Sequence, residues 1–226
     1  MSFVKWISYE GDQLYRDPSG AYTYATRHMA LDADGSPRAY HPDGHSGLDA
    51  LANAGYPHKG WRSVLVVDPT DGSKPYVQQS GPTKGFFVCK TSLYDHGSAA
   101  TDPATYVNSE VVPYLVFPGN FHALKGTGTY GDLAIVRNLD NGKETFAIVA
   151  DGGPSKAPLG EVSLALAAAL GGTHLNPRTG SGMPHGRFQY LVFPKSRSDP
   201  AWPRSNSAMD AAARSLLAGV SGWPTI

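Results

Sequence analysis

The chain has 226 residues, of which 19 are Lys or Arg and 19 are Asp or Glu, so its formal net charge is zero. This balance argues against nucleic acid and polybasic membrane partners. No apolar run approaches the roughly 18 residues that a membrane helix needs, so we expect no membrane partner. The 26 Gly and 18 Pro predict many tight turns.

Eight short apolar segments are typical of β-strands, because they are rich in Val, Ile, Phe and Tyr and end at turn-forming residues. In chain order they are VKWISY (4–9), SVLVVD (63–68), KPYVQQ (74–79), GFFVCKTSL (85–93), VPYLVFPG (112–119), GDLAIVRN (131–138), ETFAIVAD (144–151) and RFQYLVFP (187–194). Asp140, Asn141 and Gly142 predict a hairpin turn between the sixth and seventh of these strands. Cys89 is a lone cysteine, and we expect it to be a small buried hydrophobe.

Three helices are predicted, over 47–57, 161–172 and about 206–218. The last has apolar residues at helical spacing, and Ser205 or Ser207 is its expected N-cap. We therefore predict a mainly β protein with a few helices, in one domain over 1–226. The near repeat of PYLVFPGN (113–120) in QYLVFPKS (189–196) is either a chance recurrence or a sign of a pseudo-symmetric barrel.

Two local motifs carry little weight. GTGTYG (126–131) has glycines at dinucleotide-binding spacing, but it precedes a strand instead of opening a helix. HPDGH (41–45) gathers metal-ligand residue types without a further ligand at convincing spacing, so we expect an ordinary loop, no metal and no cofactor. There is no G-x-S-x-G motif for a nucleophilic serine.

Two acidic residues flank one Gly/Pro-rich loop, residues 152–160. Asp151 ends an apolar strand, and Glu161 is expected at the N-terminus of the second helix, where a negative charge is favoured. A compact loop would bring the carboxylates within several ångströms, and inverting glycosidases use two carboxyl groups about 6.5–9.5 Å apart. The alternative is that Asp151 caps the loop while Glu161 only complements the helix.

Several longer segments resemble family 75 of the glycoside hydrolases, the chitosanases first known from fungi. They are RHMALDADGSPRAYHPDGHSGLDALANAGYP (27–57), KPYVQQSGPTKGFFVCKTSL (74–93), YVNSEVVPYLVFPG (106–119), GDLAIVRN (131–138) and NGKETFAIVADGGPSKAPLGEVSLALAAALG (141–171). The similarity covers about 24–194. One departure is Val162, where the family pattern has a small residue.

The resemblance implies hydrolysis of β-1,4 links between glucosamine units of chitosan, with inversion, by Asp151 and Glu161. The arrangement of a strand, Asp151, a Gly/Pro-rich loop and a helix is similar to that of double-psi β-barrels, so by analogy we expect a single-domain β-barrel of this type. We expect an endo-acting monomer, secreted as a mature form without its signal peptide; the alternative is a cytoplasmic protein. Because a helix N-terminus favours an ionised carboxylate, the sequence favours Asp151 as the acid and Glu161 as the base.

Further acidic and aromatic residues are candidates for substrate binding. Asp32 and Asp34 are expected to bind sugar amines, with Tyr40 or Trp61 stacking on a ring and Asp132 following the glycine-rich turn. Alternatively, these aspartates only form turns.

Two other function classes stay open. One is a non-catalytic carbohydrate-binding barrel, and the other is a hydrolase or lytic transglycosylase acting on peptidoglycan.

Overall fold

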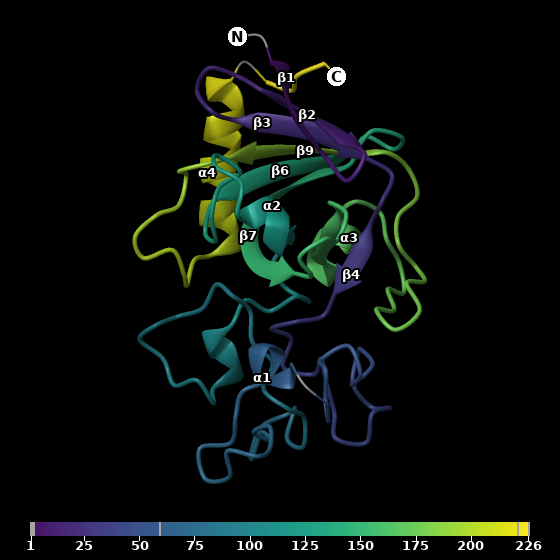
Figure 1. Ribbon diagram of the computed structural model, residues 1–226, viewed down its shortest axis with the longest axis vertical. Helices are drawn as coiled ribbons and strands as arrows, with labels where there is room; N and C mark the ends of the chain where they lie inside the picture. The colour runs from purple at the N-terminus through teal and green to yellow at the C-terminus, as the bar shows by residue number, and fades with distance from the viewer. Residues whose placement is uncertain (1–2, 59, 221, 226) are drawn as a thin grey trace.

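A nine-stranded mixed sheet organises the computed structural model, which describes residues 3–58, 60–220 and 222–225 (Figure 1). The strands lie in the order β1-β2-β3-β9-β6-β7-β5-β8-β4. Their bounds are β1 Val4–Tyr9, β2 Asp12–Arg16, β3 Tyr22–Thr26, β4 Ala30–Asp32, β5 Tyr114–Pro118, β6 Leu133–Asn138, β7 Glu144–Gly153, β8 Glu161–Ser163 and β9 Phe188–Phe193. The prediction of a mainly β, single-domain protein is confirmed. The closed double-psi barrel stays a prediction, because β1 and β4 are the two ends of this strand order.

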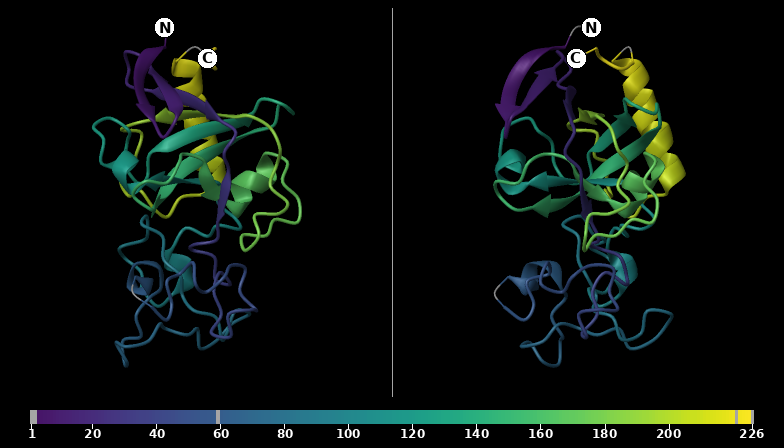
Figure 2. Two further views of the ribbon diagram at one scale, coloured as in Figure 1. Left: turned by 45° about the vertical axis from the view of Figure 1, so that its right-hand side comes forward. Right: turned by 90° about the vertical axis from the view of Figure 1, so that its right-hand side faces the viewer.

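The helices are short except for the last one. They are α1 Trp61–Val64, a 3-10 helix at Pro103–Thr105, α2 Gly119–His122, α3 Leu164–Ala169 and α4 Asn206–Gly219. Helix α4 packs against β6 and β7, as Figure 2 shows from the side. It buries Met209 and Ala213. The Ser205 hydroxyl accepts a hydrogen bond from Ala208 N, which confirms the first of the two expected N-caps.

Apolar side chains cover both faces of the sheet, because successive residues of a strand point to opposite sides. Leu115 and Phe117 of β5 join one core cluster, whereas Tyr114 and Val116 join the other. The predicted β6–β7 hairpin is confirmed, with Leu133 opposite Ile148. This hairpin forms the centre of the sheet, and it places the end of β7 beside β5.

The two YLVF segments lie on either side of the β6–β7 hairpin, as β9 and β5. Strand β9 is antiparallel to β6, but β5 is parallel to β7, so β5 and β9 run in the same direction. A twofold axis that exchanges β6 with β7 would require β5 and β9 to run in opposite directions. The repeated sequence therefore gives two sheet strands that such an axis does not relate.

Residues 33–112, called here the loop region, extend below the sheet in Figure 1 and contain little regular structure. The strands predicted over 63–68, 74–79 and 85–93 are wrong as regular strands, since they meet only in isolated bridges such as Leu65–Cys89. Their apolar residues instead build a small core that includes Cys89, whose burial is confirmed. Short segments interrupted by Pro and Gly bury side chains without completing ladders.

The helix predicted over 47–57 is also wrong, because this segment forms successive turns. The Asp49 carboxylate accepts hydrogen bonds from Ala50 N at 2.7 Å and from Asn53 Nδ2 at 2.9 Å. Local bonds of this kind compete with helical ones and favour a turn. The helical turn forms later, at α1.

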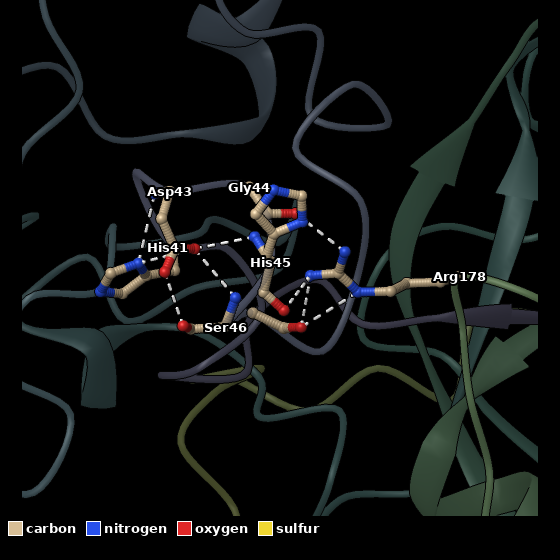
Figure 3. Close-up of polar contacts among 7 residues, drawn as sticks. His41, Asp43, Gly44, His45, Ser46 and Arg178 are labelled. Atoms are coloured by element: carbon tan, nitrogen blue, oxygen red, sulfur yellow. Dashed lines mark hydrogen bonds and ion pairs between the residues drawn. The ribbon is translucent and has the colours of Figure 1, made fainter.

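Arg178 ties the loop region to the segment between α3 and β9 (Figure 3). Its guanidinium donates to the carbonyls of Gly44 at 2.8 Å, His45 at 2.9 Å and Gly47 at 2.7 Å. Within the same loop, Asp43 accepts from His45 N and from Ser46. The HPDGH segment is thus a hydrogen-bonded loop that is held in place just before Asp49.

Candidate active site

A cavity of about 510 Å³ opens between the end of the sheet and the loop region. Its lining includes five carboxylate residues and, among the residues that the structure describes, neither Lys nor Arg. The lining residues are Leu31, Asp32, Asp34, Tyr40, Asp49, Asn53, Ser63, Val64, Val116, Asp151, Gly152, Gly153, Pro154 and Glu161. Such a cavity concentrates negative potential and attracts cationic ligands.

Asp151 lies on β7, where the pairing with β5 changes register. Leu115 pairs with Val149, but Val116 pairs with Asp151, so Ala150 is an extra residue. A β-bulge re-aims the side chain beside it. The bulge turns Asp151 to the same face as Val116, and both side chains line the cavity.

Three donors hold one oxygen of the Asp151 carboxylate. Oδ1 accepts from Ser92 N at 3.0 Å, from the Ser92 hydroxyl at 2.6 Å and from Gly152 N at 2.7 Å. Burial raises the pKa of Asp151, and the donors of Ser92 and Gly152 oppose this rise. Hydrogen bonds to the charged form favour ionisation, so these donors limit the rise in the pKa of Asp151, which burial still keeps above its ordinary value.

Glu161 lies in β8 and not at a helix N-terminus, which corrects the sequence expectation. Helix α3 begins at Leu164 with Ser163 as its N-cap, so the helix dipole does not act directly on Glu161. The preceding Gly160 has φ 114°, and a Cβ at this position would lie 2.3 Å from the His28 carbonyl oxygen. Only glycine fits this turn, which delivers Glu161 to the edge of the cavity.

The Glu161 carboxyl is buried like that of Asp151, but no hydrogen bond from the described residues offsets the effect of this burial on its pKa. Burial raises its pKa to about 7, with further contributions from the negative charges of Asp151 and Asp49. A carboxyl with this pKa is half protonated near neutrality. It is therefore suited to donate a proton.

Strand β5 separates the two acids and fixes their relative position. Val116 pairs with Asp151 on one side, and the antiparallel pairing of Leu115 with Val162 places Glu161 beside Val116 on the other. Two strand spacings put the Cα atoms of the acids about 10 Å apart, on the same face. Glu161 Oε2 lies 2.8 Å from where a Cβ of Gly153 would be, so this glycine leaves room for the carboxyl.

Asp32 and Asp34 bring two further carboxyls to the same cavity. Strand β4 pairs in parallel with β8, and Asp32 there accepts a hydrogen bond from Asp34 N at 2.8 Å. Asp34 Oδ1 accepts from the Tyr40 hydroxyl at 2.8 Å and from Cys89 Sγ at 3.3 Å. Burial, followed by repulsion from nearby carboxylates, raises the pKa of both aspartates well above the usual range.

The cavity thus contains five of the seven residues that the sequence singled out: Asp32, Asp34, Tyr40, Asp151 and Glu161. Tyr40 is 3% exposed and donates its hydroxyl to Asp34, so it acts through that carboxylate and offers no open ring face for stacking.

Trp61 and Asp132 do not line the cavity, and their expected roles are corrected. Trp61 is 3% exposed, and the Arg62 guanidinium lies 4.4 Å from its ring centroid. Asp132 is completely buried, where its carboxylate accepts from Thr129 N at 2.8 Å and from Arg197 N at 2.9 Å. Both side chains stabilise local structure.

Sequence reasoning gave no role to two residues of the site. Asp49 was one of several aspartates in its segment, and only the fold shows that it lines the cavity while Asp43 does not. Ser92 contacts Asp151 from 59 positions away along the chain, and no local pattern indicates that pairing.

No protein-family model matches the chain, and no curated protein matches it. Among the described residues, no group of three or more His, Cys, Asp or Glu side chains is arranged to hold a metal ion. In the same part of the chain, none of the helices has the length and apolarity needed to cross a membrane.

Proposed function

We propose that the chain is a glycoside hydrolase that cleaves β-1,4 links between glucosamine units of chitosan with inversion. The observation that carries the proposal is the acidic cavity, in which Asp151 and Glu161 face the same space from either side of β5. A spacing of two strands leaves room for a water molecule and a sugar between an acid and a base. Glucosamine polymers carry ammonium groups at mildly acid pH, and the lining carboxylates complement them.

In this mechanism Glu161 is the general acid and Asp151 is the general base. Glu161 has a pKa of about 7 and donates its proton to the leaving glycosidic oxygen. The three hydrogen bonds to Asp151 Oδ1 favour its ionised form, and its other oxygen removes a proton from the attacking water. These roles are the reverse of the sequence expectation, since that expectation placed Glu161 at a helix N-terminus.

The test is a product assay on chitosan, chitin and peptidoglycan, with the anomer of the first product followed by NMR. We expect reducing ends from chitosan only, with an α-anomer released from the β-link. An anhydro sugar would indicate a lytic transglycosylase instead. Binding of chitosan without any release would indicate a carbohydrate-binding protein.

Replacing Asp34 with Asn should separate charge recognition from general sugar binding. We expect about tenfold weaker binding of glucosamine oligomers and less than about twofold weaker binding of N-acetylated ones. Burial raises the pKa of Asp34, and only the glucosamine oligomers bring an ammonium that favours its ionised form. Calorimetric titration of both ligands measures the difference. Asp43→Asn, which lies outside the cavity, is the matched control; equal losses for both ligands in Asp34→Asn would refute the charge argument.

Replacing Ser92 with Ala should shift the acid limb of the pH–activity profile to higher pH. The change removes the shortest hydrogen bond to Asp151, so the pKa of this base rises further and the base is ionised only at higher pH. The profile of kcat/KM between pH 3 and 8 is the measurement. An unchanged acid limb with a shifted alkaline limb would instead assign the base role to Glu161.

A further inference from the structure

A second cavity adjoins the acidic one. It has a volume of about 390 Å³ and is lined by Ser63, Lys90, Thr91, Ser92, Tyr94, Ala100 and Tyr106. Ser63 lines both cavities, and Ser92 of the second cavity binds Asp151 of the first. The two cavities are therefore neighbouring parts of one groove that passes the proposed base.

The charge of the groove changes between its two parts. The second cavity has no carboxylate among its described lining residues, and Lys90 is its charged side chain. Lys90 Nζ donates to the Arg62 carbonyl at 2.5 Å, and Lys90 N donates to the Val64 carbonyl at 2.7 Å. An ammonium has three donors, so Nζ retains two for a ligand that accepts hydrogen bonds.

The second cavity also has an accessible aromatic ring. Tyr94 is 39% exposed, and the buried Tyr106 supports it at a centroid distance of 6.2 Å. Ser63, Thr91 and Ser92 also line this cavity. An apolar face with a few placed polar groups is typical of small-molecule sites, and a sugar ring has both complementary surfaces.

We propose that this second cavity is a subsite for a sugar residue whose 2-amino group is acetylated. The inference rests on the proposed function and adds its substrate class, a partially N-acetylated chitosan. Lys90 repels a free glucosamine ammonium. An acetamido carbonyl instead accepts a hydrogen bond from Nζ while the sugar ring packs on Tyr94, and glucosamine residues occupy the acidic cavity.

The test compares a glucosamine hexamer with hexamers carrying one N-acetyl group at a known position. For the wild type, we expect the acetylated residue at a constant distance from the cleaved bond, and a kcat/KM about fivefold or more above that of the deacetylated hexamer. In Lys90→Met this ratio falls to near one, mainly because the deacetylated hexamer is cleaved faster. Mass spectrometry of end-labelled products gives both quantities.

Lys84→Met is the matched control, since Lys84 is exposed in the loop region and lines neither cavity. It should keep the wild-type ratio. Cleavage by the wild type without regard to the acetyl position overturns the subsite. An equal loss for both substrates in Lys90→Met overturns it as well.

A binding measurement keeps the subsite testable when the hydrolase proposal fails. If the wild type cleaves no glucosamine oligomer, the proposed function is wrong, and calorimetry with the diacetylated and the deacetylated disaccharide decides on the subsite. Tyr94→Ala should then weaken binding of the diacetylated disaccharide by about tenfold and leave the deacetylated one unchanged. Equal effects on both disaccharides would overturn the inference.

Discussion

Glu161→Gln is expected to lower kcat on glucosamine oligomers by about 10³-fold, because the amide keeps the shape of the side chain but cannot donate an acidic proton. The loss should be much smaller on a substrate with an activated leaving group, such as a glycosyl fluoride, which departs without protonation. The ratio of the two losses measures the acid role directly. Glu10→Gln, the same chemical change at an exposed turn between β1 and β2, should leave both rates unchanged.

The Asp151→Ala variant tests the role of Asp151 as the general base. It should be inactive on both kinds of substrate, and azide should restore turnover by taking the place of the activated water. The product should be an α-glycosyl azide, the inverted anomer of the β-substrate. Azide rescue of the Glu161 variant in place of the Asp151 variant would show that the roles are exchanged.

Glu161→Gln is also expected to stabilise the fold at alkaline pH by about 3 kcal/mol. The folded protein raises the pKa of Glu161 from 4.5 to about 7, so it holds this proton more tightly than the unfolded chain does. That contribution is fully present below about pH 4.5 and is lost as the pH rises through 7. Above pH 7 the folded state therefore contains a buried negative charge that the amide removes.

Urea denaturation at pH 4, 6 and 8 measures this effect. The difference in unfolding free energy between the variant and the wild type should be near zero at pH 4 and should grow towards pH 8. Glu10→Gln should show no such growth. A constant difference at all three pH values would mean that the substitution acts through packing and not through the raised pKa.

Five of the nine sheet strands, β1, β5, β6, β7 and β9, could be predicted from the sequence, because they contain apolar runs bounded by clear turns. The β6–β7 hairpin and α4 with its Ser205 cap could be predicted as well. The short strands β4 and β8 and the strands β2 and β3 were not predicted. In the loop region the same kind of apolar run failed to predict regular strands, since Leu65 and Cys89 meet in a single bridge. Local patterns indicate which residues are buried, but they do not show whether a segment forms enough backbone hydrogen bonds with a neighbouring segment to become a regular strand.

The candidate site shows the same limit. The acids at 151 and 161 were predictable from their positions at either end of one loop. Their electrostatic environments were not, because Ser92 reaches Asp151 from a distant segment and β8 moves Glu161 away from the helix dipole. Asp132 and Trp61 were misassigned for a related reason: residue type alone does not show whether a side chain lines a cavity or is buried in the protein interior.

The groove is assembled from two structurally different parts of the chain. Strands β7 and β8 supply Asp151 and Glu161, whereas the loop region supplies Asp34, Asp49 and Lys90. Substitutions in that region, apart from Ser92, which holds Asp151, should therefore redirect polymer selectivity while the bond-breaking chemistry is preserved. This division makes residues 33–112 the natural target for directed evolution toward polysaccharides with other patterns of modification.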